Sequence, residues 1–111
     1  DIVSIHAPLN ERTNRLIGQE QLAMMKPAAY LVNVGRGAII VEEDLAEAVD
    51  NGIIAGAGID VFVQEPIPED HPYLKMQHPE RMRLTPHIAW ASIEARRRLI
   101  DIMADNIRKG W

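Results

Sequence analysis

Short apolar runs alternate with amphipathic segments along this chain, and their order predicts the fold. The runs that predict strands lie at residues 1–6, 30–34, 54–62 and 82–84. Helical spacing of apolar positions occurs at residues 19–26, at residues 42–50 and beyond Ser92. Strands that alternate with helices of this length are joined by right-handed crossovers within a parallel sheet. The pattern therefore predicts an α/β protein.

The segment at residues 29–50 combines a strand, a turn and a helix. Its strand, residues 30–34, is almost entirely apolar, which suits a strand covered on both faces. Gly35 and Gly37 flank Arg36 and allow either a sharp turn or the close approach of another molecule. Arg36 is thus expected at the carboxyl end of a strand, where open parallel sheets bind ligands. The alternative is that Arg36 is only a solvated loop residue.

The helix after this turn is predicted from its two ends. Acidic residues occupy its first turn, where a helix N-terminus favours negative charge, namely Glu42, Glu43 and Asp44. Leu45, Ala48 and Val49 repeat on one face, and Asn51-Gly52 provides a left-handed stop. The helix at residues 19–26 is expected to turn Leu22 and Met25 inward and to end before Pro27.

The C-terminal third of the chain contains a loop and a long helix. Residues 63–85 are polar and rich in proline, so they predict a loop apart from the strand at residues 82–84. The last helix begins at Ser92, a good N-cap, with Glu94 in its first turn. Its apolar stripe predicts packing in a core and consists of Ile100, Met103, Ile107 and Trp111. Its solvent side is expected to carry the pairs Arg97 with Asp101 and Asp105 with Lys109.

Composition narrows the class of protein. The chain has 111 residues, a net charge of -4 and no cysteine, which predicts one soluble globular unit without disulfides. The acidic balance argues against a nucleic-acid partner, and no segment is apolar and long enough to predict a membrane span. The chain begins at Asp1, without a methionine and inside an apolar strand, so we interpret it as a piece of a longer protein.

Three ionisable residues stand out because each follows a predicted strand: Arg36, Glu65 and His87. A parallel sheet gathers such residues along one edge. An arginine binds a carboxylate through two parallel hydrogen bonds, and a histidine beside a carboxylate serves as an acid or base. His71 and His78, which lie in the proline-rich loop, are interpreted as structural. A metal site built from His71, His78 and His87 lacks any recognised ligand spacing.

Four motifs extend over nearly the whole chain: HAPLNERTNRLIG, MKPAAYLVNVGRGAIIVEEDL, GAGIDVFVQEP and TPHIAWASIEA. In sequence and order they resemble the signature blocks of the D-isomer-specific 2-hydroxyacid dehydrogenases. Within that family the HIAWAS block, with Trp90, is most similar to the glycerate dehydrogenases, also called hydroxypyruvate reductases. The resemblance implies the C-terminal half of a Rossmann-like, doubly wound parallel sheet, NAD or NADP as cofactor and a cytoplasmic homodimer.

The resemblance also implies roles for individual residues. Arg36 would bind the substrate carboxylate and polarise its carbonyl, His87 would donate the proton, and Glu65 would orient His87 and favour its protonated form. The cofactor would lie against Ala7, Val34, Gly35, Arg36, Asp60, His87 and Ala89, with Asp60 meeting the nicotinamide carboxamide. The small-molecule partner would be a 2-hydroxy or 2-keto acid such as glycerate or hydroxypyruvate, with neither nucleic acid nor membrane involved.

The sequence departs from the family pattern in several places. The glycine-rich phosphate loop and the catalytic domain are absent, and residues 69–81 are elongated and charged. Val41-Glu42 replaces the usual Val-Asp, a longer cap that is expected to weaken the helix start slightly. Two alternatives to the dehydrogenase remain open. One is a corepressor that uses the same fold for binding, and the other is a half-domain that is inert alone.

Overall fold

The protein, described by a computed structural model for residues 1–110, forms a parallel sheet with helices packed against it. The strands are β1 (Ile2–Ile5), β2 (Tyr30–Asn33), β3 (Gly56–Ile59) and β4 (Met82–Leu84). The α-helices are α1 (Gln19–Ala23), α2 (Glu42–Asp50) and α3 (Ile93–Arg108). The 3-10 helices are η1 (Gly37–Ile39), η2 (Pro72–Leu74) and η3 (Pro79–Arg81). The structure thus confirms the predicted α/β class and Rossmann-like parallel sheet.

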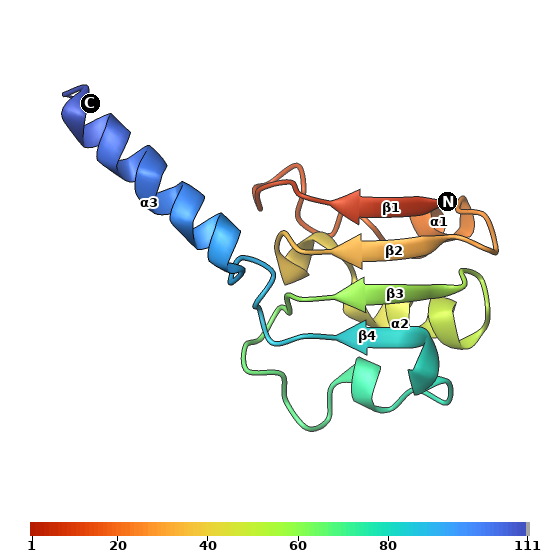
Figure 1. The fold of residues 1–111 in the computed structure, drawn as a ribbon. Coiled ribbons are helices and arrows are strands. Elements are labelled where there is room, and N and C mark those ends of the chain that lie inside the picture. The colour runs from red at the N-terminus through yellow and green to blue at the C-terminus, as the bar shows by residue number, and fades with distance from the viewer. Residues whose placement is uncertain (111) are drawn as a thin grey trace.

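The strands lie side by side in the order in which they occur in the chain, β1-β2-β3-β4, and all of them are parallel. Their carboxyl ends therefore meet at one edge of the sheet (Figure 1). The order has a second consequence, because successive right-handed crossovers that advance in one direction all pass over the same face of the sheet. Helices α1 and α2 accordingly lie on one side of it (Figure 1).

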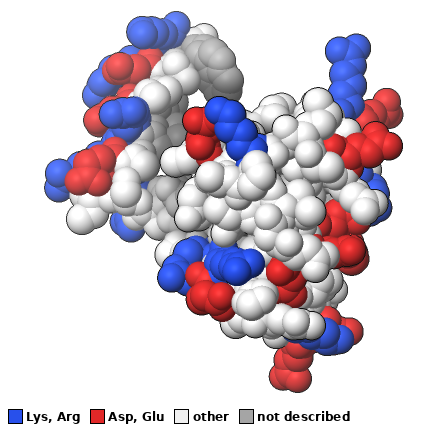
Figure 2. Space-filling view, turned by 90° about the vertical axis from the view of Figure 1, so that its right-hand side faces the viewer, with Lys and Arg blue, Asp and Glu red and all other residues white. Residues whose placement is uncertain are grey.

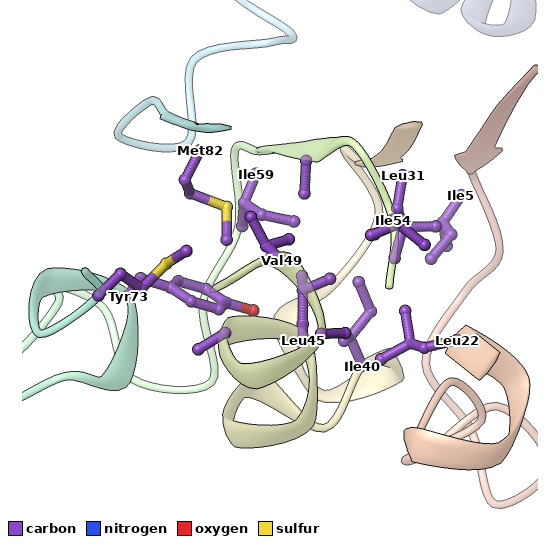
Figure 3. Close-up of a cluster of buried hydrophobic side chains, with 14 of the residues drawn as sticks. Ile5, Leu22, Leu31, Ile40, Leu45, Val49, Ile54, Ile59, Tyr73 and Met82 are labelled. Atoms are coloured by element: carbon purple, nitrogen blue, oxygen red, sulfur yellow. The ribbon is translucent and has the colours of Figure 1, made fainter. Parts of the chain in front are cut away.

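The hydrophobic core fills the space between the sheet and these helices. Leu31 of β2 and Ile59 of β3 point into it, and α2 contributes Leu45 and Val49 (Figure 3). Leu22 is the buried residue of α1. Met82 and Tyr73 extend the core beneath the proline-rich loop, which is therefore packed rather than free. The inward faces predicted for both helices are confirmed, with Met25 partly buried against this core.

The opposite face of the sheet is open as far as residues 1–110 are concerned. On β2, Leu31 and Asn33 are buried, whereas Tyr30 is 51% exposed and Val32 is only partly covered. The expectation that this strand is covered on both faces is therefore wrong for residues 1–110. Its nearly unbroken apolar run indicates surfaces suited to burial, but no crossover within residues 1–110 passes over this side.

Several predicted elements end earlier than expected. The strand predicted at residues 54–62 pairs only over Gly56–Ile59, and residues 54–55 and 60–62 lie outside the strand. The helix predicted to reach residue 26 ends at Ala23. Met24 and Met25 donate their N–H groups to the carbonyls three residues earlier rather than four, just before Pro27. The strand Met82–Leu84 and the left-handed stop at Gly52, with a φ of 69°, are confirmed. Residues 63–85, predicted as a loop apart from this strand, also contain η2 and η3.

Helix α3 does not pack in the core. It projects away from the sheet, and no described residue of it is buried (Figure 1). Ile100, Met103 and Ile107 are 65%, 54% and 74% exposed, so the predicted core packing is wrong for them, and Trp111 lies outside the described residues. The N-cap at Ser92 is confirmed, since its hydroxyl accepts a hydrogen bond from the Ala95 N–H.

The ion pairs predicted on α3 also differ. In the described part of this helix, Asp105 pairs with Arg108 rather than Lys109, and Arg97 and Asp101 are not within ion-pair distance. Figure 2 views the molecule from the amino ends of the strands and shows acidic and basic side chains interspersed on that face. No helix within residues 1–110 combines the length and apolarity needed to cross a membrane.

The start of α2 differs from its expected chemistry. Val41 is the N-cap residue and makes no side-chain capping bond, so Glu42 is the first residue inside the helix. The Glu42 carboxylate does not cap its own helix. It accepts hydrogen bonds from the Val63 N–H and from His71 instead. The prediction that Glu42 acts as a lengthened cap is therefore wrong, because the side chain reaches the loop after β3.

Candidate active site

A histidine and a glutamate meet just beyond the carboxyl ends of β3 and β4. Glu65 follows β3, His87 follows β4, and their Oε2 and Nδ1 atoms lie 2.8 Å apart. Both side chains are partly exposed, at 37% and 39%. Because Nδ1 is engaged by the carboxylate, His87 Nε2 is the ring nitrogen that remains to meet another molecule. The sheet has thus brought together two of the three ionisable residues, as predicted.

The Glu65 carboxylate is held from two sides. Oε2 faces His87, and Oε1 accepts a hydrogen bond of 3.0 Å from the Phe62 N–H. The His87 hydrogen bond and then the Phe62 hydrogen bond lower the pKa of Glu65, against a smaller effect of burial. The charges of His87 and Arg36 lower the pKa further. Glu65 is therefore held ionised at neutral pH.

The backbone at His87 adopts a conformation that residues other than glycine rarely adopt. His87 has a φ of 54°, in the left-handed region. Its N–H donates to the Asp60 carbonyl at 2.8 Å, and the next two N–H groups, of Ile88 and Ala89, donate to the Asp60 carboxylate at 2.9 Å each. The surrounding hydrogen bonds thus fix the turn that points His87 at Glu65.

Asp60 is the centre of this arrangement. Burial alone would raise the pKa of Asp60, but hydrogen bonds from the Thr85 hydroxyl and from the Ile88 and Ala89 backbones outweigh burial, so the pKa is lowered. Asp60 was predicted only as a contact for the cofactor, and its hold on the His87 turn was missed. An acidic residue within the apolar run at residues 59–62 was the available signal, since a carboxylate buried there requires several donors.

The turn that carries Arg36 is built around Asn33, which is 1% exposed. Its side-chain amide donates to the Arg36 carbonyl at 2.9 Å, and its oxygen accepts from the Gly35 N–H at 3.0 Å. These bonds hold the chain so that the Arg36 side chain is exposed, with Nη1 bonded to the Gly35 carbonyl at 2.8 Å. Asn33 was missed as a site residue, although a polar residue in an apolar strand signals this role.

The structure explains why residue 37 is a glycine, which the sequence alone did not. A Cβ atom at Gly37 would lie 2.1 Å from the Phe62 carbonyl carbon and 2.4 Å from the Val63 nitrogen. Gly37 therefore touches the peptide that follows β3, and the close approach it permits is to this chain itself. The contact places the Arg36 turn beside the turn that carries Glu65.

Apart from His87, the residues predicted to bind the cofactor line two adjacent hollows at this edge of the sheet. The first is lined by His6, Ala7, Pro8, Leu9, Val34, Gly35 and Arg36. The second is lined by Val32, Val34, Gly58, Ile59, Asp60, Arg83, Thr85, Ile88 and Ala89. Val34 borders both hollows. His87 borders a third, apolar hollow with Glu65 and Phe62.

Of the remaining histidines, His71 and His78 take no part in the contact between Glu65 and His87. His71 is 4% exposed and is occupied by Glu42 and by the Tyr73 N–H. His78 lies 3.3 Å from Glu80. In the described residues these two and His87 do not form a metal-binding group.

Comparison with known proteins identifies the relatives of this chain. Residues 1–89 match the family described as D-isomer specific 2-hydroxyacid dehydrogenase, NAD binding domain. The glyoxylate reductase of Thermofilum pendens is 49% identical over 107 residues, which are 96% of this chain and 31% of that protein. The glyoxylate/hydroxypyruvate reductase B of Pectobacterium carotovorum is 48% identical over 107 residues, 96% of this chain and 32% of that protein.

A solved structure agrees with these matches. D-lactate dehydrogenase with NAD+ from Lactobacillus jensenii is similar with a TM-score of 0.81 and 32% identity, over 96% of this chain and 35% of that chain. The chain thus spans about a third of the length of the relatives it matches. The family match includes the turns of Arg36, Glu65 and His87. This chain therefore belongs to the D-isomer-specific 2-hydroxyacid dehydrogenase family, within its NAD-binding domain.

Proposed function

We propose that this chain supplies the catalytic residues and the nicotinamide-binding residues of an NAD(P)-dependent D-2-hydroxyacid dehydrogenase. In this proposal the substrate is a small 2-keto acid, hydroxypyruvate or glyoxylate, which is reduced reversibly to the hydroxy acid. The observation that carries the proposal is the His87–Glu65 pair, 2.8 Å apart beyond the carboxyl ends of the sheet. The substrate class is supported by the names of two relatives, a glyoxylate reductase and a glyoxylate/hydroxypyruvate reductase.

Hydride arriving at C2 of the keto acid leaves negative charge on the carbonyl oxygen, so the reaction needs a positive neighbour and a proton. When bound, NAD(P)H would supply the hydride. Arg36 supplies the positive neighbour and holds the substrate carboxylate, because its planar guanidinium offers two parallel donors. Its exposed side chain sits on a turn that is fixed by the buried Asn33, so the charge is held in place before substrate binds.

His87 supplies the proton through Nε2, the nitrogen that Glu65 does not engage. Glu65 fixes the ring orientation, and its negative charge favours the imidazolium that reduction requires. The lowered pKa of Glu65 keeps that charge present across the neutral range. In the oxidative direction neutral His87 accepts the proton instead.

The residues at this edge fit the nicotinamide end of the cofactor. The second hollow has apolar walls at Val34 and Ala89 for a flat ring, and Asp60 offers a carboxylate that can accept from a carboxamide N–H. Ala7 and Gly35 in the first hollow are small and leave room for the cofactor to approach the protein backbone. NAD and NADP both remain compatible with these contacts, since the two cofactors carry the same nicotinamide carboxamide.

We assign the activity to a full-length enzyme and not to this chain alone. Full-length enzyme here means a polypeptide that contains this chain together with the other two thirds found in its relatives. A homodimer and a cytoplasmic location stay predictions. Nothing in the comparisons supports the corepressor interpretation.

The proposal is tested by replacing His87 with Gln in the full-length enzyme and following NADH oxidation with hydroxypyruvate or glyoxylate. We expect kcat to fall by at least about a hundredfold, as removal of a general acid does, with cofactor binding retained. His78→Gln is the matched control, because His78 also pairs with a glutamate but lies outside the site. Equal activity in the two variants would contradict the assignment of His87.

A further inference from the structure

A second histidine–glutamate pair lies inside the protein, next to the candidate active site. Glu42 Oε2 and His71 Nε2 are 2.9 Å apart, and the two side chains are only 10% and 4% exposed. Buried ionisable pairs are costly and rarely improve stability over apolar residues of the same size. The location of this pair therefore calls for a reason beyond packing.

The hydrogen bonds of the pair leave one arrangement of protons. His71 Nδ1 accepts from the Tyr73 N–H at 3.2 Å, so its proton is on Nε2 and is donated to Glu42. A second proton on Nδ1 would face the Tyr73 N–H, donor against donor. The other oxygen of Glu42, Oε1, accepts from the Val63 N–H at 2.9 Å. Glu42 thus uses both oxygens to connect the start of α2 to the loop after β3.

Glu42 binds the loop after β3 one residue away from the backbone N–H that binds Glu65. The Phe62 N–H donates to Glu65, and the next N–H along the chain, that of Val63, donates to Glu42. Gly37 packs against the peptide between Phe62 and Val63. The Phe62 ring lies edge-on to the His71 ring, with centroids 6.0 Å apart. Glu42, Gly37 and the His71 ring therefore hold the chain at Phe62 and Val63.

We propose that Glu42 and His71 are positioning residues that fix the turn after β3, and so determine how the Glu65 carboxylate meets His87. The inference rests on the proposed function, because it assigns these residues to the same reaction. A shift of the Phe62–Val63 peptide carries Glu65 with it through the Phe62 hydrogen bond. Displacements of about 1 Å at a reacting group change rates by as much as a hundredfold.

The test uses Glu42→Gln in the full-length enzyme. An amide offers one acceptor oxygen where the carboxylate offers two, so either the Val63 N–H or the His71 N–H loses its partner. The exposed neighbour Glu43→Gln is the matched control, because it removes the same charge from the same helix start. His71→Phe is a second variant, which keeps a ring against Phe62 but removes the donor to Glu42.

The first readout is the set of NMR signals from the His87 ring, which needs no turnover. The groups that act on this site, Glu65, Asp60 and Arg36, stay unaltered in Glu42→Gln, His71→Phe and Glu43→Gln. We expect Glu65→Gln to displace the ring signals most, because it changes the partner of Nδ1, and Glu42→Gln to displace them in the same direction by a smaller amount. The double variant is expected to show only the Glu65→Gln displacement, since the two residues act through one contact.

The second readout is steady-state reduction of the keto acid. Glu42→Gln and His71→Phe are expected to lower kcat about tenfold with a smaller change in KM, whereas Glu43→Gln leaves both unchanged. A merely structural pair would lower thermal stability but leave the His87 ring signals in place, and that result overturns the inference. Failure of both variants to fold also overturns it, because the pair is then a folding element. Displaced His87 signals in a protein without reductase activity would refute the proposed function while retaining the positioning pair.

Discussion

Replacement of Asp60 by Asn removes the group on which the His87 turn depends. The Asp60 carboxylate accepts from the Thr85 hydroxyl and the Ile88 N–H through one oxygen, and from the Ala89 N–H through the other. Asparagine keeps one acceptor and turns an amide NH2 towards a backbone N–H. One buried donor then has no acceptor, which costs about 1–3 kcal/mol. We expect the free energy of unfolding of the full-length enzyme to fall by that amount at neutral pH.

The effect on stability depends on pH in a direction that the structure fixes. The pKa of Asp60 is lowered from its ordinary value of 3.8. The contribution of Asp60 is therefore complete above pH 3.8 and is lost as the pH falls through the folded-state pKa. The difference between wild type and Asp60→Asn is expected to be constant at neutral pH and to shrink in stronger acid.

Urea unfolding of both proteins across this pH range measures the effect. Asp105→Asn on α3 is the matched control, because its partner Arg108 is exposed and such pairs contribute about 0–1 kcal/mol. Relaxation of the His87 turn is also expected to lower kcat/KM for reduction by up to about a hundredfold. A stability loss no larger than that of Asp105→Asn would refute the idea that Asp60 holds this turn.

Three further predictions concern the Arg36 turn and the isolated chain. Arg36→Lys keeps the charge but loses the planar fork, so the transition-state stabilisation measured by kcat/KM for the keto acid is expected to fall by about 2–4 kcal/mol, with cofactor affinity little changed. A loss of only a few-fold in kcat/KM would exclude Arg36 as the residue that binds the substrate carboxylate. Gly37→Ala places a Cβ 2.1 Å from the Phe62 backbone and is expected to destabilise by about 1–3 kcal/mol in urea unfolding, whereas Gly58→Ala, whose Cβ meets nothing closer than 3.9 Å, is not. The isolated chain exposes β1, with Ile2 71% exposed, and the apolar side of α3, so it is expected to self-associate without turnover; a strictly monomeric species in sedimentation would contradict this.

The sequence predicted the order and type of the main elements because their periodicity is local. Alternation of strands and helices dictates a parallel sheet, and a parallel sheet places Glu65 and His87 at one edge whatever the details of packing. The N-cap at Ser92 and the stop at Gly52 were also predicted, since each depends on the chemistry of one residue. These features need no knowledge of what lies elsewhere in the fold.

Other features depend on partners that local pattern does not specify. The apolar stripe of α3 shows that this face suits burial, but not whether residues 1–110 supply the surface that buries it. The exposed side of β2 is a similar case. Glu42 was interpreted from its place at a helix start, whereas its actual partners, His71 and Val63, are distant in sequence. Contacts of that kind follow from the fold rather than from spacing.

The central claim is that Glu65 acts on His87 as a charged partner in proton transfer. Its most direct test is the pH profile of kcat/KM for keto-acid reduction, with saturating cofactor, in Glu65→Gln and in the matched control Glu80→Gln, whose glutamate faces His78 outside the site. Reduction needs protonated His87, so activity falls as the pH rises, and loss of the Glu65 charge removes a group that favours protonation. We predict that the descending limb moves to lower pH in Glu65→Gln and stays in place in Glu80→Gln. An unchanged limb in Glu65→Gln would show that Glu65 does not favour the protonated form of His87.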